Sequence, residues 1–520
     1  MKEKKAIITM AILVAALMVI PAALSATMGS TTAPVSENDV KIVGLPVGTN
    51  GFGDTLVAGG DGDEFEPVIE ADASGNILVA YTEQQGVFES DVLLASSTNG
   101  GSSWNVISSP PWGDLEGLQY SPAMIYYPDG GAIVGTFADN TGGWQMFFSV
   151  ADVSDETTYA YNGWGGFDEI GSSAVSYATF DDGTKIIVTP LTGTSSGFEG
   201  TCMWSYVDFT EMTGYGGSFY YDAQSATGEY TDAGNMEGFA FTGNYYGFVC
   251  DALRASTDTY QPLIKWTKYE EEPDLEYTSH QFWLEEQIEA KDPDAVGTGN
   301  NIYVVYQAYN PSFGDYDIKC KYSHDGGVSW DESFPAAAQL VDETNPAVYA
   351  SGSNIYVVYV KQGNLYLVES EDGGATWGDP EQVNENAGSV VAEDGAAAIS
   401  KAGIVWVDNR NGNKDIYYAT LPAPSIGVKA ISGGMGVTAT IDNTGSVDAS
   451  SVDWSIALSG PVFLGKEATG TIDTLAAGGE TTISTGLVFG IGPTTITVTA
   501  GGASKTASAF LLGPMVLGVK

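Results

Sequence analysis

Short segments in which apolar and polar residues alternate recur along most of the chain after residue 30. The segment 354–359 (NIYVVY) is typical, because it alternates and is rich in β-branched and aromatic residues. Turn-forming residues border such segments, as expected for β-strands joined by tight turns. Helical periodicity is hard to find in the same part of the chain. The pattern therefore predicts an all-β protein.

The predicted strands belong to a repeated unit. Segment 67–104 aligns by eye with 293–330 and with 346–377, and each copy contains a proline, three strand-like segments and a turn that ends in tryptophan. Weaker copies begin near residues 122, 174, 234 and 391. The units therefore start every 45 to 60 residues or so, roughly the period of four-stranded propeller blades. We predict a seven-bladed β-propeller over residues 39–422, with six blades as the alternative.

The two ends of the repeat suggest how the ring closes. The last unit stops after its third strand, near residue 422, and would leave an exposed sheet edge. We expect segment 39–47 (DVKIVGLPV) to supply the missing strand. After 421–425 (LPAPS) the composition changes to Thr, Gly, Ala, Val and Ser with few aromatics. The alternation in 426–520 predicts a small β-sandwich that resembles immunoglobulin-like or CARDB-like modules.

The N-terminus has the features of a secretory signal. Lysines precede an apolar stretch of 21 residues, 6–26, which ends in small residues. We predict a signal peptide over 1–26 and a linker over 27–38. An uncleaved anchor is the alternative, because the stretch is long enough to span a bilayer. Either way, the rest of the chain is expected to be secreted, extracellular or on the cell surface.

Charge and cysteine content restrict the partners. With 19 basic and 66 acidic residues, the net charge is −47, which disfavours nucleic acid and anionic lipid. We expect an extracellular glycan or protein ligand, and no membrane contact beyond a possible N-terminal anchor. The three cysteines form no C-x-x-C pair, so structural zinc is not expected. A disulfide between Cys202 and Cys250 and three buried thiols both remain open.

Three turns share one pattern of serine, Asp or Asn, two glycines and tryptophan. The acid or amide can accept hydrogen bonds from its own turn, the glycines permit positive φ, and the tryptophan can pack against the blade. We therefore expect a structural role. The residues concerned are Ser97, Asn99, Gly101, Trp104, Ser323, Asp325, Gly327, Trp330, Ser370, Asp372, Gly374 and Trp377.

This pattern resembles the Asp box, or BNR repeat, of sialidase-like β-propellers, over about residues 40 to 422. The resemblance implies that the box joins the third and fourth strands of a blade, away from the active site. A sialidase of that family would hold the substrate carboxylate with three arginines, beside a Tyr–Glu nucleophile pair and an Asp acid/base. This chain has two arginines, Arg254 and Arg410, and Glu66 stands where the first family arginine is expected. We therefore do not expect sialidase activity.

Acidic residues collect just before the predicted inner strands, at Glu66, Asp292, Glu343 and Asp394. If the units are in register, these residues lie on one face of the ring near its axis. They could bind a ligand or Ca²⁺, serve as a glycosidase acid/base pair, or be ordinary solvated turns. Because we find no nucleophile constellation, we expect no catalytic residue and no cofactor other than possible Ca²⁺. We favour a non-catalytic binding protein, with a glycoside hydrolase or lyase as the alternative.

Overall fold

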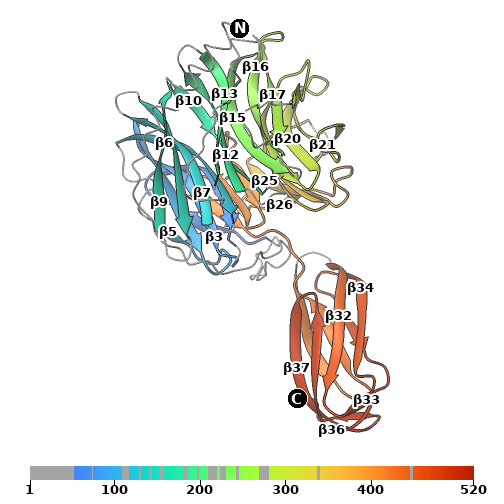
Figure 1. The fold of residues 1–520 in the computed structure, drawn as a ribbon. Coiled ribbons are helices and arrows are strands. Elements are labelled where there is room, and N and C mark those ends of the chain that lie inside the picture. Colours follow the sequence, from blue (N-terminus) through green and yellow to red (C-terminus); the bar gives the residue numbers. More distant parts are fainter. Residues whose placement is uncertain are drawn as a thin grey trace. The chain divides into compact units, whose positions relative to one another are not determined.

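The computed structural model describes residues 52–520 apart from short gaps. The gaps are 73, 108–115, 128–129, 140–142, 153–156, 168, 180–184, 196–197, 209–219, 223–229, 242–244, 269–279, 337–339 and 446–448. The expected signal peptide, linker and strand 39–47 lie outside the described residues. The described residues form strands β1 to β38 with turns between them, which confirms the all-β prediction (Figure 1). Within them, no helix has the length and hydropathy needed to cross a bilayer.

The described residues divide into two compact units, 53–420 and 421–520 with Phe52, called here the first and second units. In the first unit, the strands follow one another in chain order as antiparallel groups, of which the first two share one eight-stranded sheet through a parallel pairing of Ser90 with Leu118 (Figure 1). The first two groups are β2 (Asp63–Ala71), β3 (Ile77–Gly86), β4 (Glu89–Ser97) and β5 (Asn105–Ile107), and then β6 (Gly117–Tyr127), β7 (Gly130–Asp139), β8 (Trp144–Asp152) and β9 (Thr157–Phe167). The next three are β10 (Glu169–Ser173), β11 (Ser176–Thr179), β12 (Lys185–Ser195), β13 (Phe198–Asp208) and β14 (Tyr220–Asp222); β15 (Tyr230–Phe241), β16 (Tyr245–Arg254), β17 (Thr259–Lys268) and β18 (His280–Trp283); and β19 (Ala290–Thr298), β20 (Asn301–Asn310), β21 (Asp315–Ser323) and β22 (Asp331–Ser333). The last two are β23 (Glu343–Ser351), β24 (Asn354–Lys361), β25 (Asn364–Ser370) and β26 (Glu381–Gln382), and then β27 (Ala397–Ser400), β28 (Gly403–Asp408) and β29 (Asp415–Ala419) with β1 (Thr55–Ala58).

The first strands of these groups form a closed ring. Each of β2, β6, β10, β15, β19 and β23 contacts the first strand of the next group, and β27 contacts β2. Inner strands that meet in a ring, each followed by an antiparallel meander, are the arrangement of a β-propeller.

A strand from the N-terminal side closes the ring, but it is not the predicted one. β1 pairs with β29, with Thr55 opposite Tyr418 and Leu56 opposite Tyr417. The placement of the closing strand at 39–47 was therefore wrong. The strand that pairs is only four residues long and is followed by glycines, so its sequence pattern is weak.

Strands in the middle of the sheets are buried on both faces because a neighbouring sheet covers each side. β20 is buried from Ile302 to Ala308, and all of β28 is buried. Each apolar cluster draws on two adjacent groups, as Val249 on β16 and Val304 on β20 share one core. Cys250 and Cys320 are buried in such cores. Pairing of Cys202 with Cys250 stays a prediction, since the Cys202 side chain is outside the described part.

The boxed turns are closed by their own side chains. Asp325 Oδ1 accepts the N–H of Ser329 at 2.8 Å and the hydroxyl of Ser323 at 2.9 Å. Asp325 Oδ2 accepts the Ser329 hydroxyl at 2.6 Å. These bonds, led by the one from the Ser329 hydroxyl, lower the pKa of Asp325 to about 2. Asp372 makes the same set of bonds in the third copy, to Ser370 and Thr376.

The box also joins neighbouring sheets. Thr55, on the outermost strand of the preceding group, donates to the Gly101 carbonyl at 3.0 Å and accepts the Trp104 indole N–H at 3.4 Å. Ser333 on β22 makes the corresponding two bonds to the third copy, at 2.5 and 2.9 Å. The box therefore sits at a sheet-to-sheet seam.

The second unit contains two antiparallel sheets around one apolar core. The first sheet is β30 (Ile426–Ser432), β31 (Thr438–Asn443) and β35 (Glu480–Ser484), and the second is β32 (Ala449–Ser459), β33 (Val462–Leu464), β34 (Glu467–Leu475), β36 (Phe489–Ala500), β37 (Ala503–Gly513) and β38 (Met515–Leu517). Ile441 and Ile483 of the first sheet meet Ile456, Ile496 and Val498 of the second in this core. Two sheets that share an apolar core define a β-sandwich.

Large apolar side chains are also exposed on the second unit. Across the ladders, Phe510 lies opposite Leu517, and Leu512 opposite Met515. Scattered apolar side chains are normal on a surface, but a contiguous group is not. We call this group the apolar face; it consists of Phe463, Leu464, Leu487, Phe489, Ile491, Phe510, Leu512, Met515 and Leu517, which are 40 to 70% exposed.

Candidate functional site

Five first strands of the ring place one polar residue each at a β-bulge in a left-handed backbone conformation. The residues are Glu66, Ser121, Asn235, Asp292 and Asn345, with φ between 44° and 52°. The ladder register shifts at each of these positions. This conformation is costly for most residues other than glycine, and both such strain and bulges are frequent at functional sites. We call these five the axial residues.

Asp292 is the centre of a hydrogen-bond network that joins several strands. Asn235 Nδ2 lies 3.0 Å from Asp292 Oδ1, 2.8 Å from Asp251 Oδ2 and 3.5 Å from Asp394 Oδ2. Asn345 Nδ2 lies 3.4 Å from Asp292 Oδ2. The charge of Asp394, in the loop before β27, also acts on Asp292. Side chains from four sheets of the ring thus converge.

Burial and mutual repulsion hold protons on this network. Burial, followed by the charges of Asp251 and Asp394, raises the pKa of Asp292 to about 8. Burial also raises the pKa of Asp251 to about 7. Asp251 is only 3% exposed, and its Oδ1 has no hydrogen-bond partner. Both shifts favour the protonated forms of these two acids.

A second network lies around Glu66. Its Oε2 accepts the N–H of Ser121 at 2.8 Å and the hydroxyl of Thr82 at 3.0 Å. Ser121 Oγ accepts the N–H of Ser173 at 3.2 Å, which continues the network to β10. Burial raises the pKa of Glu66, and the negative charge of Asp394 raises it further. Glu66 is therefore within electrostatic reach of the Asp292 network.

Further acids lie two residues along the same strands. Glu237 follows Asn235 on β15, and Asp294 follows Asp292 on β19. The ladder register shifts within each of these pairs, and Asp294 Oδ2 accepts the N–H of Val348, on the neighbouring first strand β23, at 2.6 Å. The Glu237 side chain is exposed to solvent. Burial raises the pKa of Asp294 to about 7.

Of the four acids predicted from sequence, three come together and one does not. Glu66, Asp292 and Asp394 belong to the axial networks. Glu343 is fully buried and pairs instead with Lys361, 2.8 Å from its Oε1. The charge of Asp317, on the preceding sheet, helps to raise its pKa, after burial.

Four further residues of these networks were not predicted from the sequence: Ser121, Asn235, Asn345 and Asp251. The first and third of these had a usable signal, because each precedes a proline at the same place in its unit as Glu66 and Asp292 do. Asn235 precedes a methionine, and Asp251 comes from a second strand, β16, so no repeated pattern marked either.

The two arginines lie elsewhere. Arg410 is held by Asp54 at 2.9 Å and Asp408 at 2.6 Å, and its guanidinium stacks over Tyr417 at 3.8 Å. Arg254 lies 4.8 Å from the ring centre of Trp283. Neither is an axial residue, and the Arg410 guanidinium is already occupied by two carboxylates.

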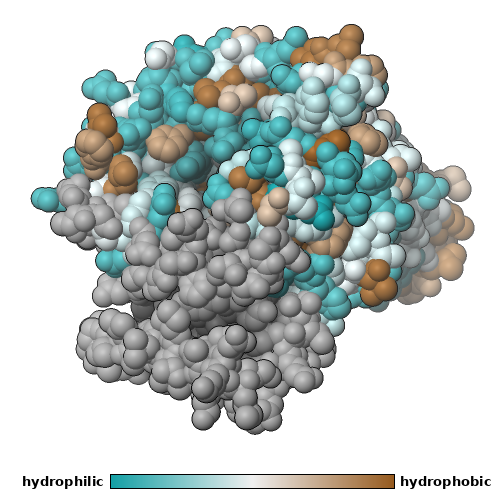
Figure 2. All heavy atoms as spheres, turned by 90° about the horizontal axis from the view of Figure 1, so that it is seen from above, coloured by the Kyte–Doolittle hydropathy of each residue, from teal (hydrophilic) through white to brown (hydrophobic). Residues whose placement is uncertain are grey.

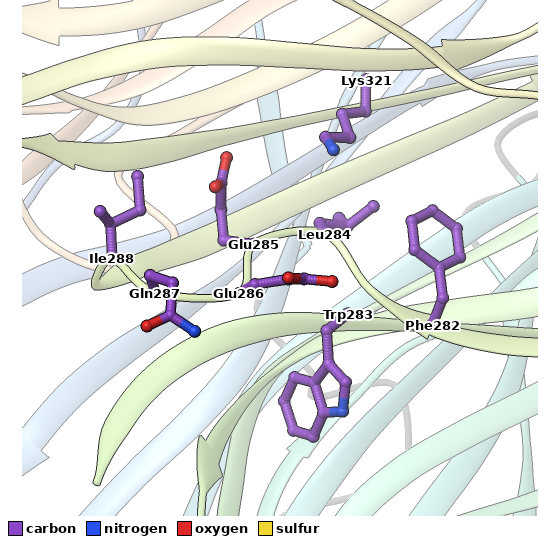
Figure 3. Close-up of a pocket in the computed structure, with 8 residues that line it drawn as sticks. All are labelled: Phe282, Trp283, Leu284, Glu285, Glu286, Gln287, Ile288 and Lys321. Atoms are coloured by element: carbon purple, nitrogen blue, oxygen red, sulfur yellow. The ribbon is translucent and has the colours of Figure 1, made fainter. Parts of the chain in front are cut away.

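A pocket of about 400 Å³ opens where the outermost strand β18 leads into β19 (Figure 3). Its walls are Phe282, Trp283, Leu284, Glu285, Glu286, Gln287, Ile288 and Lys321. Glu285 is engaged, since it pairs with Lys319 at 2.5 Å and accepts the Tyr306 hydroxyl at 2.9 Å. None of the axial residues lines this pocket. On the face seen in Figure 2, hydrophilic residues cover most of the coloured surface and hydrophobic ones form small scattered groups.

No family model and no curated protein matches this chain. Among solved structures, the chain is similar to the Hadza microbial sialidase Hz136, with 12% identity, TM-score 0.36 and coverage of 62% of this chain and 66% of that one. It is similar to a Dyadobacter fermentans protein of unknown function, with 10% identity, TM-score 0.42 and coverage of 70% and 96%. It is also similar to the Aleuria aurantia lectin in complex with α-methyl-L-fucoside, with 12% identity, TM-score 0.36 and coverage of 59% and 97%. The match spans just under two thirds of the sialidase, and all three similarities are too distant to indicate a function.

Proposed function

We propose that this chain is a secreted or cell-surface Asp-box β-propeller of seven blades. It binds an extracellular glycan or protein ligand at its axis and does not catalyse a reaction of that ligand. An immunoglobulin-like module, the second unit, would carry the propeller. The observation that carries the proposal is the convergence of the axial residues, which present carboxyl, amide and hydroxyl groups from several blades to one place.

The chemistry of the axial residues fits recognition of polar, uncharged or cationic groups. Carboxylates and amides hydrogen-bond to sugar hydroxyls or to amino groups of a protein ligand. Their backbone strain is the kind of cost that folded proteins retain at functional sites.

The same chemistry argues against a sialidase. An anionic sugar would meet Glu66, Asp292 and Asp394 and no arginine among the axial residues. Of the chain's two arginines, Arg410 is occupied by its two carboxylate partners.

The second unit supports a display role. Its core is apolar, and its apolar face is a surface that would suit attachment to another component of the cell surface. Together with the expected signal peptide, this favours a propeller exposed to extracellular ligands.

A glycan array probed with the full-length secreted protein tests the proposal. We expect binding to a defined set of glycans or to a surface protein, and a loss of affinity of at least tenfold in Asp292→Ala and Asn235→Ala. Asp372→Ala, in the third boxed turn, is the matched control and should bind like the wild type. Binding that survives both axial substitutions would place the ligand elsewhere and refute the proposal.

The alternative is a glycoside hydrolase or lyase that uses the same carboxyl groups. The specific observation in its favour is that burial and the charges of Asp251 and Asp394 raise the pKa of Asp292 to about 8, the direction that a general acid requires. Against it, the amide of Asn235 contacts both carboxyl groups, at 3.0 and 3.5 Å, whereas glycosidases leave room for substrate between carboxyls that are about 5 Å apart in retaining enzymes and further apart in inverting ones. Hydrolysis of an aryl glycoside by the wild type, abolished in Asp292→Asn, would establish the enzyme.

A further inference from the structure

One end of the larger sheet in the second unit is apolar on both faces. Inward side chains of β37 and β38 there, such as Leu511 and Val516, belong to the core. The outward side chains at the same end are also apolar and belong to the apolar face. A sheet with one solvated face normally alternates apolar and polar residues, so folding of this unit does not account for the second apolar side.

The ladder register arranges the outward side chains in rows that cross the strands. Side chains directly opposite one another are about 5 Å apart at Cβ, and residues two apart on a strand share a face, so adjacent rows form one continuous patch. The rows are Leu464 with Phe489; Ile491 with Leu512 and Met515; and Pro493 with Phe510 and Leu517. All eight residues are uncharged.

The same strands become polar next to these rows. The outward positions that follow are Thr495 opposite Ser508, and then Thr497 opposite Thr506. On this side the apolar face therefore ends at hydroxyl groups. An apolar centre with a polar rim is the usual composition of a protein–protein interface.

The size of the apolar face is also that of a protein–protein interface. A large apolar side chain has roughly 150 to 200 Å² of surface to bury. The nine residues of the face are 40 to 70% exposed, so together they present about 800 Å². Specific complexes of standard size bury about 800 Å² on each partner. The face alone is therefore large enough for a dimer.

Charge favours a second copy of the chain as the partner. The net charge is −47, so two copies repel each other over most of their surface. Residues 421–520 hold four lysines and six acidic residues, a net charge of only −2. Two copies therefore meet with the least repulsion at this face, whereas a basic partner would be drawn to the acidic first unit.

We infer that two copies of this chain pair through their apolar faces in a two-fold symmetric dimer. A two-fold interface brings the same patch of both copies together, so the patch has to be complementary to itself. An uncharged apolar patch meets that condition.

A lipid bilayer is the other apolar partner that such a face could contact. Elements that lie on a membrane surface usually carry lysine or arginine beside their apolar side chains, because anionic headgroups attract them. Here the bordering residues on β36 and β37 are threonine and serine. A second copy therefore fits the face better than a bilayer does.

The dimer gives the attachment role of the second unit a definite partner, namely another copy on the same surface. This step rests on the proposed function, whereas the pairing itself needs no ligand. Two paired chains hold two ligand sites, so binding to a multivalent surface gains avidity without any new contact to the ligand.

Sedimentation equilibrium of the full-length protein without ligand tests the pairing. We expect a reversible equilibrium between monomer and dimer. Leu512→Asp should raise the dissociation constant at least a hundredfold, because it would bury two like charges in the interface. Thr506→Asp is the matched control, since it adds the same charge on the same strand and sheet face outside the rows, and its dissociation constant should stay within twofold of the wild type.

Phe510→Ser separates loss of pairing from loss of folding. It adds no charge and should raise the dissociation constant at least tenfold. Leu512 and Phe510 are 55% and 47% exposed, so below the dissociation constant, where the chain is monomeric, both variants should unfold like the wild type.

Three results would overturn the dimer. One is a wild type that stays monomeric at every concentration, and another is a dimer that both folded variants leave unchanged. The third is a monomer that binds phosphatidylcholine vesicles and loses them in Leu512→Asp, which would assign the face to a bilayer. A glycan array separates this outcome from the proposed function: a dimer that binds no ligand would refute only the function, and a monomer that binds one would refute only the dimer.

Discussion

The two units of this chain bury very different side chains. The core of the second unit is built from Ile, Val, Leu and Ala, and its buried polar side chains in the described part are Asn443 and Thr494. Both are satisfied, for Asn443 Nδ2 donates to the Leu475 carbonyl at 3.0 Å and Thr494 Oγ1 to the Ser459 carbonyl at 2.7 Å. The first unit instead buries many acids, among them Glu64, Asp251 and Glu343.

The difference teaches how each unit is held together. Apolar burial is insensitive to protons and ions, so the second unit should keep its stability across mild changes of solution. The first unit depends on protons, lysines and hydrogen-bond donors that neutralise its acids. A ring of sheets tolerates this because the acids lie at its axis and seams, while apolar clusters fill the space between the sheets.

Ile496→Ala should give the largest effect. Ile496 is fully buried in the second unit, and its truncation should lower the free energy of unfolding of that unit by about 3 kcal/mol. Ile491, on the same strand but 59% exposed, is the control. Ile491→Ala should change the free energy of unfolding of the second unit by less than about 0.5 kcal/mol. Calorimetry of the full chain should show the loss in one of two transitions only. Equal losses for the two variants would contradict the assignment of the core.

Gly327→Ala should have the second-largest effect, and it should destabilise the first unit. At φ 87° the new Cβ would lie 2.5 Å from Trp266 Cζ2 on the preceding sheet, so strain and overlap should cost about 2 kcal/mol. Gly326→Ala is the control, because Gly326 has φ 74° but its nearest neighbour would be 3.8 Å away. Denaturant titration should give Gly326→Ala a free energy of unfolding closer to that of the wild type than Gly327→Ala has. If the two variants were equally stable, the role of the boxed turn in joining neighbouring sheets would be refuted.

The third prediction concerns pH. Burial and then the charge of Asp415 raise the pKa of Glu64 from 4.5 to about 8. The stability that protonated Glu64 contributes is present below pH 4.5 and is lost as the pH rises through 8. Glu64→Gln should therefore stabilise the first unit relative to the wild type at pH 8 and leave it unchanged near pH 4. Thermal scans from pH 4 to 8 measure this, with the second unit's transition as an internal control. A variant that follows the wild type at every pH would show that Glu64 is not the titrating group.

Asp372→Ala should have the smallest effect. It removes the acceptor for the Thr376 N–H and hydroxyl, and should lower the melting temperature of the first unit by about 2 °C. Asp372→Asn is the control, because Asn99 already fills this position in the first copy and accepts the Ser103 N–H at 3.0 Å. Ligand binding should be the same in both variants. A loss of affinity without a loss of stability would mean that the box is a site.

Part of the site was visible in the sequence. Glu66 and Asp292 could be recognised because each is an acid that precedes a proline at the same place in its repeat unit. The bulge lies at that same place in both units. Glu343 was misplaced by two residues, because its own unit puts Asn345 at the bulge. A bulge inserts an extra residue and shifts the facing of the side chains around it, so nearness in sequence to an inner strand did not decide which acid points to the axis.

By itself, the sequence determined the all-β class, the repeated unit, the boxed turns and the change of composition after residue 421, because these depend on local periodicity and turn chemistry. Only the tertiary structure decided which strand closes the ring and which acids become neighbours. Asn235, Asp292 and Asp394 are separated by scores of residues, and they meet because their strands share one axis. Burial at that axis then raises the pKa of Asp292, which no local pattern in the chain encodes.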